Sequence, residues 1–487
     1  MTGRGFGHKY SADPASRPSA TPHEPGTHEQ ELGTRGTAWN PETRLYSDGV
    51  VVGADGAPVV VPPHSGLRRI PGTGFLDPSS GTLSGTAAPT VDDVDRAVAD
   101  LERSDLPGQD APYADMARTA LIDIDVLTFG NGAAVAAGSP YWRFVWPRDA
   151  GFMSVALSTA GRHDDARRQL EYVASVQEDD GGWEARYLPD GSGDVPDGRG
   201  RQLDGIGWIL WATWVLTRTS ARPGEGLTPG AGGTPDTGRA AAAAQMPTPL
   251  TRMVVRAVRA AMDVLDPATS LPRASQDFWE MDIEEATLGS AAPLLLGLRC
   301  GRDLLTGIAD TAGGSSDVPI LAGRARELAR QADDTSRRLF EAIRTTFGRH
   351  GYSRRTTGAG GRDASTAFLL PPFAPHTDDA ERAWRAAVAA TTVANGGVRP
   401  GEEWTDLATA WTPQVSLHAL TAASIGDTVL AHRLLSWLDI RRTRLGALPE
   451  KVTADGRPAA VAPLGLTGAT VLLALTTLED RPPPIPR

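Results

Sequence analysis

The chain has 487 residues, a formal net charge of −11 and a hydrophobic content of 40%. This length allows one large domain or two to three ordinary ones, with enough apolar residues for a substantial core. No block rich in Lys and Arg is present, which argues against nucleic acid or an anionic membrane as the main partner. No run approaches the ~18 apolar residues of a membrane span, and the N-terminus lacks the apolar segment of a signal peptide. We expect a soluble, cytoplasmic protein.

Residue types that bind metals are sparse and scattered. The single cysteine, Cys300, excludes an intrachain disulfide framework, and its apolar helical surroundings predict a buried thiol. The nine histidines show no ligand spacing, so we expect no metal site. Tryptophan (12 residues) outnumbers Phe (10) and Tyr (7). Its flat apolar face and N–H donor suit sugar rings as well as protein cores.

The first part of the chain has little predicted structure. Residues 1–38 are rich in Gly, Pro, Ser, Thr and His, and we expect them to be a disordered tail. Residues 39–112 are expected to form an N-terminal extension. In it, the valine runs Val50–Val52 and Val59–Val61 flank an Asp-Gly turn and predict a small hairpin. Thr90 is the predicted cap of a short helix with one apolar face.

From residue 113 onward the sequence predicts one helix after another. Apolar residues recur at helical spacing, and a cap or breaker marks one end of each segment. The predicted helices are 113–127, 149–161, 163–177, 202–218, 248–265, 284–307, 320–346, 363–370, 378–392, 407–424, 426–440 and 466–478. Strand signals are nearly absent, so residues 113–487 are expected to form one all-α domain. Two Gly/Pro-rich insertions, 221–238 and 313–318, are expected to be surface loops.

Five unusual polar motifs occur in this helical region at related places. They are WPRDAG (146–151), RQLDGIG (201–207), DFWE (277–280), VRPGEEW (398–404) and LPEK (448–451). Each lies at or just before the start of an even-numbered helix, in a count that omits the helix after Thr90 and includes a weak one at 363–370. If the helices alternate up and down, all five motifs share one end of the molecule. Six helical hairpins in a ring, an (α/α)6 barrel, would carry a pocket at that end.

The motifs contain carboxylates, arginines, an amide and tryptophans, which are typical of a neutral carbohydrate site. Rings stack on sugar faces, and Asp and Arg bind hydroxyl groups. Glycoside hydrolysis needs two further carboxyl groups, one to protonate the leaving oxygen and one to activate water. Glu280 is the candidate acid, because the adjacent Trp279 would disfavour its ionised form. Glu450 is the candidate base, and Lys451 beside it would help to keep it ionised.

The runs YWRFVWPRDA, RQLDGIG, FWE, GGVRP and ALPEK resemble glycoside hydrolase family 15, which contains glucoamylases, glucodextranases, some trehalases and isomaltose-cleaving glucosidases. The resemblance covers residues 113–479 with the same motif order. It implies an (α/α)6 barrel and an inverting exo-hydrolase that removes glucose from non-reducing ends. It also implies the residue roles: Glu280 as general acid, Glu450 as general base, and Arg148, Asp149 and Arg399 as sugar contacts.

The remaining substrate contacts are predicted from the same motifs. Glucose is expected to sit on Trp146, and no cofactor is needed. The other expected substrate-binding residues are Trp142, Gln202, Asp204 and Trp279. Met281 stands where many glucoamylases have a second acidic residue, and the 39–90 segment is too short for the β-sandwich of many bacterial members. These departures favour a small α-glucoside, with an α-1,6 linkage as one option, over starch granules.

Several alternatives stay open at the level of sequence. Taken alone, Arg148 and Asp149 also suit the salt-bridged start of a helix, and Asp204 suits an acidic first turn. The scaffold could serve a non-catalytic glucan-binding or regulatory protein. Trehalase-type specificity is a further option. An unsaturated-uronide hydrolase would need more cations than Arg148 and Arg399. The sequence does not indicate the oligomeric state.

Overall fold

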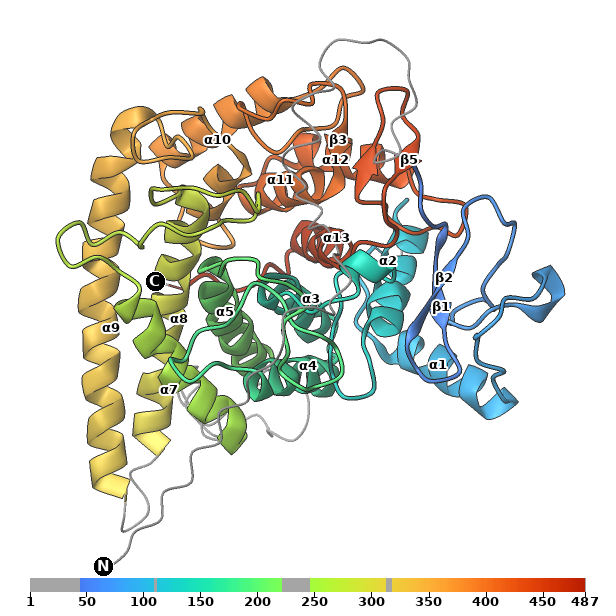
Figure 1. Cartoon of the computed structure of the whole chain (residues 1–487), viewed down its shortest axis with the longest axis horizontal. Helices are drawn as coiled ribbons and strands as arrows, with labels where there is room; N and C mark the ends of the chain where they lie inside the picture. The colour runs from blue at the N-terminus through green and yellow to red at the C-terminus, as the bar shows by residue number, and fades with distance from the viewer. Residues whose placement is uncertain (1–43, 109–111, 221–245, 312–317, 487) are drawn as a thin grey trace, which may run out of the picture. The chain divides into compact units, whose positions relative to one another are not determined.

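The computed structural model describes residues 44–108, 112–220, 246–311 and 318–486, shown in colour in Figure 1. The predicted tail at 1–38 and the insertion at 221–238 lie outside the described residues. So does the insertion at 313–318, apart from Val318, which begins a helix.

The chain from residue 112 onward is helical, as predicted, and each predicted helix has a counterpart in the structure. The helices are α2 (Ala114–Leu127), α3 (Pro147–Thr159), α4 (His163–Ser175), α5 (Asp204–Thr219), α7 (Thr248–Asp263), α8 (Leu288–Thr311), α9 (Val318–Thr346), the 3-10 helix η6 (Ala364–Leu369), α10 (Asp378–Thr391), α11 (Thr412–Ser424), α12 (Thr428–Asp439) and α13 (Gly465–Leu478).

Six of these elements form a closed inner ring. α3 packs on α5, α5 on α8, α8 on η6, η6 on α11, α11 on α13, and α13 packs back on α3. The other helices lie outside this ring, each against an inner partner, and Figure 1 shows α5, α3, α13 and α11 following one another around the middle of the molecule. α3 buries nearly every residue, whereas the outer helix α4 buries only one face. This arrangement is the (α/α)6 barrel that the motif positions predicted.

Some boundaries differ from the sequence prediction for local reasons. The weak helix at 363–370 is the 3-10 helix η6, whose first turn is capped by the Asp363 side chain accepting from the Ser365 amide at 2.9 Å. α8 begins at Leu288, just after Thr287, whose hydroxyl accepts from the Ser290 amide at 3.3 Å. Helix starts therefore follow these side-chain caps rather than the first apolar residue of the pattern.

A small sheet beside α11 was not predicted. β3 (Ala410–Trp411) pairs antiparallel with β4 (Lys451–Val452), which pairs antiparallel with β5 (Pro458–Ala459). This pairing explains why α11 begins at Thr412 and not at 407. Strands of two residues are too short to show an alternating pattern, so the sequence carried no signal for them.

The N-terminal extension contains both elements expected for it. β1 (Gly49–Val52) pairs antiparallel with β2 (Pro58–Val61), and α1 (Val91–Arg103) begins at a capping box formed by Thr90 and Asp93. The extension is joined to the helical part by backbone and side-chain contacts. The Tyr46 amide donates to the Ala460 carbonyl at 2.9 Å.

The barrel core is aromatic where α3 and α5 meet. Trp208 and Trp211 are fully buried against Phe152 and Phe373. Cys300 is a buried free thiol, as predicted, and burial raises its pKa. Within the described part of the chain, no helix is both long enough and apolar enough to cross a membrane.

Candidate active site

The polar motifs meet at one end of the inner ring, at the starts of its helices. Trp146 is the N-cap of α3 with Pro147 directly behind it, a sequence that suits the first turn of a helix. Asp204 begins α5, Glu280 lies in the loop before α8, and Glu450 lies in the loop before α13. Hydrogen bonds between these starts, described next, bring residues more than a hundred positions apart into one cluster.

Glu280 is held by donors from two other elements. Its Oε1 accepts from Trp146 Nε1 at 2.9 Å and from Gln202 Nε2 at 3.0 Å, and its Oε2 is ion-paired with Arg199. Its φ of 58° is in the left-handed region. The sequence suggested an apolar wall around this carboxyl group. Instead, the contacts are hydrogen-bond donors, and these favour the ionised form.

Arg148 connects Glu280 to two aspartates. Its guanidinium donates to Gln202 Oε1 at 2.7 Å and to Asp204 Oδ2 at 3.1 Å, and its Nε lies 3.6 Å from Asp149 Oδ2. Asp204 also accepts from Trp208 Nε1 at 3.1 Å. The local ion pair of a helix start is therefore present, but it is part of a larger buried network that reaches across α3 and α5.

Asp149 has an unusual electrostatic position. Burial raises its pKa to about 6, and the charges of Asp204 and Glu450 act in the same direction while Arg148 opposes them. Glu450 therefore lies near enough to Asp149 for its charge to act there.

Glu450 is buried, and its backbone is fixed on both sides. Its amide donates to the Val461 carbonyl at 2.8 Å, and its carbonyl accepts from the Thr412 amide at 2.9 Å. Burial raises the pKa of Glu450, whereas the charge of Lys451 and a hydrogen bond from the Trp142 side chain lower it. Lys451 acts in the predicted direction, but burial outweighs it. Among the described residues, Glu450 Oε2 has no hydrogen-bond partner.

Two residues that were predicted to contact the sugar, Trp279 and Arg399, contact neighbouring parts of the protein. Trp279 precedes Glu280 but packs against Trp404, with ring centroids 5.1 Å apart. Arg399 donates to the backbone carbonyls of Glu402, Trp404 and Ala390, at 3.2, 2.7 and 3.1 Å. None of these contacts joins Arg399 to the cluster around Glu280, and its bonds hold the loop before α11 in place.

Three tryptophan rings from segments far apart in the sequence contact one another near the candidate site. Trp279 contacts Trp404, and Trp404 contacts Trp411 at 5.2 Å, with both pairs edge to face. The Arg354 guanidinium lies 4.0 Å from the ring centroid of Trp279, and Lys451 Nζ lies 4.0 Å from that of Trp411. We call these five residues the tryptophan row. The sequence did not predict these ring contacts, because partners so far apart along the chain share no local pattern.

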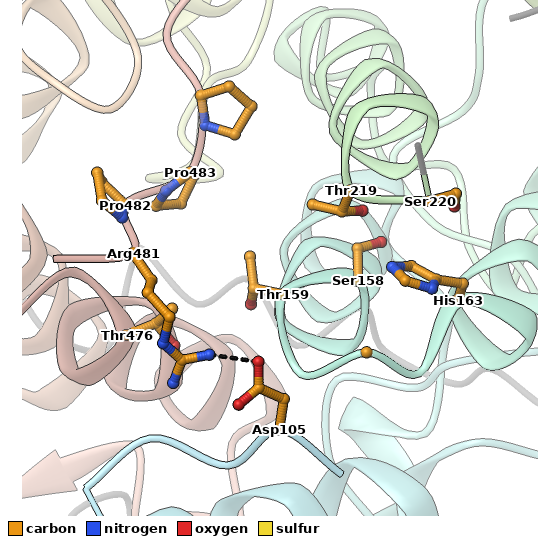
Figure 2. A pocket seen from close by; sticks show the side chains of 12 residues that line it. Asp105, Ser158, Thr159, His163, Thr219, Ser220, Thr476, Arg481, Pro482 and Pro483 are labelled. Atoms are coloured by element: carbon orange, nitrogen blue, oxygen red, sulfur yellow. Dashed lines mark hydrogen bonds and ion pairs between the residues drawn. The ribbon is translucent and has the colours of Figure 1, made fainter. Parts of the chain in front are cut away.

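A hollow without paired carboxyl groups lies at the other end of the ring. It has a volume of about 420 Å³ and is lined where α3, α5 and α13 end, by residues that include Thr159, Thr219 and Thr476. Figure 2 shows its ion pair, in which Arg481 donates to Asp105 at 2.5 Å. Asp105 is the only carboxyl group among its lining residues. It therefore lacks the paired carboxyl groups that glycoside hydrolysis needs.

Metal ligands do not cluster in the described ranges. No group of three or more His, Cys, Asp or Glu side chains that could hold a metal ion is found among these residues.

Comparisons with known proteins bear on the fold. No protein-family model matches the chain. A glycosidase in complex with glucose superposes with a TM-score of 0.56 and 20% identity, covering 79% of this chain and 99% of that one. A bacterial glucoamylase complexed with acarbose gives a TM-score of 0.59 and 14% identity, covering 81% and 59%. The chain has the glucoamylase fold. This is the fold implied by the resemblance to glycoside hydrolase family 15.

One curated relative is similar over a short segment. An uncharacterized glycosyl hydrolase of Methanocaldococcus jannaschii is 35% identical over 97 residues, which make up 20% of this chain and 15% of the relative. The match thus spans a small part of either protein.

Proposed function

We propose that the protein is an inverting, exo-acting α-glucoside hydrolase. The observation that carries this proposal is the polar cluster at one end of the barrel, which is bordered by Glu280 and by Glu450. Glycoside hydrolysis requires two carboxyl groups that flank the scissile bond. The similarity of fold to a glycosidase complexed with glucose and to a glucoamylase complexed with acarbose supports the same substrate class.

The residues divide into a binding part and a reacting part. Arg148, Asp149 and Asp204 would bind the hydroxyl groups of the terminal glucose through charge-assisted hydrogen bonds, with the ring lying on Trp146. Trp142 and Gln202, which bind the two glutamates, would keep the reacting groups in register with that sugar. Trp279 and Arg399 would contribute indirectly, because their own contacts fix the loops next to the site.

The reaction follows from the two carboxyl groups. Glu280 protonates the glycosidic oxygen as the bond to the anomeric carbon breaks, and Glu450 removes a proton from the water that attacks the opposite face. Room for that water requires the two carboxyl groups to be about 6.5–9.5 Å apart. The unpartnered Oε2 of Glu450 is suited to accept the proton.

A panel of glucose disaccharides tests the proposal. Isomaltose, maltose and trehalose are compared with soluble starch by kcat/KM, and the anomer of the released glucose is read by NMR. We expect initial release of β-glucose and a preference for a small α-glucoside. Initial release of α-glucose would refute inversion, and a preference for long starch chains would refute the small-substrate assignment. Binding of glucosides without any glucose release would favour the alternative, a non-catalytic glucan-binding protein on the same scaffold.

A further inference from the structure

Arg199 contacts Glu280, the candidate acid, although none of the sequence motifs includes Arg199. It belongs to the segment between α4 and α5, and its guanidinium is ion-paired with Glu280 Oε2. Its Nε lies 3.7 Å from Asp197 Oδ2 in the same segment. The exposed fraction is 16% for the Arg199 side chain and 22% for that of Glu280, so the pair is largely shielded from solvent.

The two oxygens of Glu280 are not equivalent. Oε1 already accepts two hydrogen bonds, from Trp146 and Gln202, which together fix the carboxyl plane. Oε2 is therefore the oxygen that can carry a transferable proton to a glycosidic oxygen. Arg199 occupies this same oxygen. A leaving group within hydrogen-bond reach of Oε2 and the Arg199 guanidinium would compete for one position.

We propose that Arg199 is a positioning residue that pairs with Glu280 in the free enzyme and is displaced from Oε2 by the leaving sugar. This inference rests on the proposed function. Displacement removes the cation that favours the carboxylate, so Glu280 takes up from solvent the proton that it then donates to the glycosidic oxygen. The displaced side chain keeps Asp197 as a partner, so it stays beside the leaving group and contributes to leaving-group specificity.

The surroundings of Arg199 are compatible with such a movement. Burial and the like charges of Arg186 and Arg148 lower its pKa, while Asp197 acts in the opposite direction. Asp197 therefore helps to keep Arg199 charged, and it remains beside the guanidinium when the contact to Glu280 is lost. Arg148 of α3 is linked to Glu280 through Gln202, and Asp204 of α5 is linked in turn through Arg148.

The pH dependence of hydrolysis tests the proposal. The alkaline limb of the kcat/KM profile reports loss of the acid's proton in the free enzyme, and that of kcat reports it in the complex. In the wild type we expect the alkaline limb of the kcat profile to lie at higher pH than that of the kcat/KM profile. Arg199→Gln should move the kcat/KM limb to higher pH, toward the kcat limb, and leave the acidic limb in place. Arg199→Lys should stay closer to the wild type.

Arg201→Gln is the matched control. Arg201 lies two residues away, binds Asp180 and Glu184, and its side chain is 36% exposed. The pH profile of the Arg201→Gln variant should equal that of the wild type. An unmoved alkaline limb in Arg199→Gln, or an equal shift in Arg201→Gln, would overturn the role of Arg199 while the hydrolase proposal stands. If the wild type hydrolyses no α-glucoside, the proposed function fails and this inference falls with it.

Discussion

At the scale of single residues, the two glutamates are distinguished by their partners. Glu280 is surrounded by donors and is partly accessible, whereas Glu450 is buried with one oxygen unpartnered. The motif positions identified both residues, but the surroundings could not be inferred from neighbours in sequence. Trp279, next to Glu280 in the chain, turns its ring to Trp404, while the contacts to Glu280 come from Trp146, Gln202 and Arg199.

Replacing either glutamate by glutamine separates binding from chemistry. Glu280→Gln removes the proposed proton donor and Glu450→Gln the proposed base, and a general acid or base typically contributes roughly 10²–10⁴-fold to the rate. We expect kcat for the best disaccharide to fall by about that factor in each variant, with glucose binding by calorimetry retained. Hydrolysis within tenfold of the wild type in either variant would remove that residue from the mechanism.

The raised pKa of Asp149 predicts a trade-off between stability and activity. Its pKa is raised to about 6 in the folded protein from an ordinary value near 3.8, so its contribution to stability is full below about pH 4 and is lost as pH rises through about 6. Asp149→Asn should therefore raise the free energy of unfolding at pH 7 by up to about 3 kcal/mol. Arg148 keeps Asp204 as a partner in this variant.

The test of this trade-off is a series of thermal melts from pH 4 to pH 7. The gain in Tm of Asp149→Asn should vanish near pH 4 and reach its full size above pH 6, while kcat/KM falls about 10–100-fold through loss of a charged hydrogen bond to the sugar. Asp164→Asn is the control, because the Asp164 side chain is 89% exposed on α4. A gain that is the same at pH 4 and pH 7 would contradict this explanation.

At the scale of elements, helical periodicity and the positions of the motifs predicted the barrel but not its irregular parts. The inner helices α3, α5, α8, α11 and α13 are apolar almost all round and carry the motifs at their starts. The sixth position of the ring is the short helix η6, whose capping by Asp363 is a local signal. The β3–β5 sheet depends on pairing between residues 40 positions apart, for which a single sequence has no pattern.

The tryptophan row gives a physical reason why the loop that carries Glu280 and the loop that carries Glu450 would keep a fixed position relative to each other. One end, Trp279, directly precedes Glu280, and the other end, Lys451, directly follows Glu450. Cations over the terminal rings and edge-to-face contacts between the rings favour one fixed geometry. Arg354 is itself anchored by two hydrogen bonds to Asp277, at 3.0 and 2.9 Å. We infer that the row helps to set the separation of the two catalytic carboxyl groups.

Removal of the middle ring tests this role. Trp404→Leu should lower kcat by about 10–100-fold with a smaller change in KM, since a displacement of about 1 Å can cost that much. Trp404→Phe, which keeps an aromatic ring, should recover most of the rate. Trp214→Leu is the control for lost core packing: Trp214 also lies under a cation, with Arg218 at 4.1 Å, but on the last turns of α5. Equal losses of kcat in both leucine variants would contradict a positioning role.

At the scale of the whole described molecule, the N-terminal extension and the barrel are joined through a buried ion pair. Arg69 donates to Asp123 on α2 at 2.6 Å and to the Val50 carbonyl of β1 at 3.0 Å. The exposed fraction is 8% for the Arg69 side chain and 4% for that of Asp123. Burial raises the pKa of Asp123 even though Arg69 opposes it. Residues 39–487 form one compact unit by their contacts.

This pair predicts that the extension and the barrel unfold together. Arg69→Met leaves Asp123 buried without its cation and should lower the free energy of unfolding by about 3–5 kcal/mol, whereas Arg69→Met combined with Asp123→Leu should recover most of that loss. The neighbouring Arg68→Met is the control, because Arg68 is 67% exposed and pairs only within the extension, so its cost should be about 0–1 kcal/mol.

Urea unfolding is followed by far-UV circular dichroism, which reports the barrel helices, and by residual hydrolysis. Coincident transitions are expected in all four proteins, because the extension has no large core of its own. An early transition in Arg69→Met that leaves the helical signal intact would mean that the extension folds independently of the barrel.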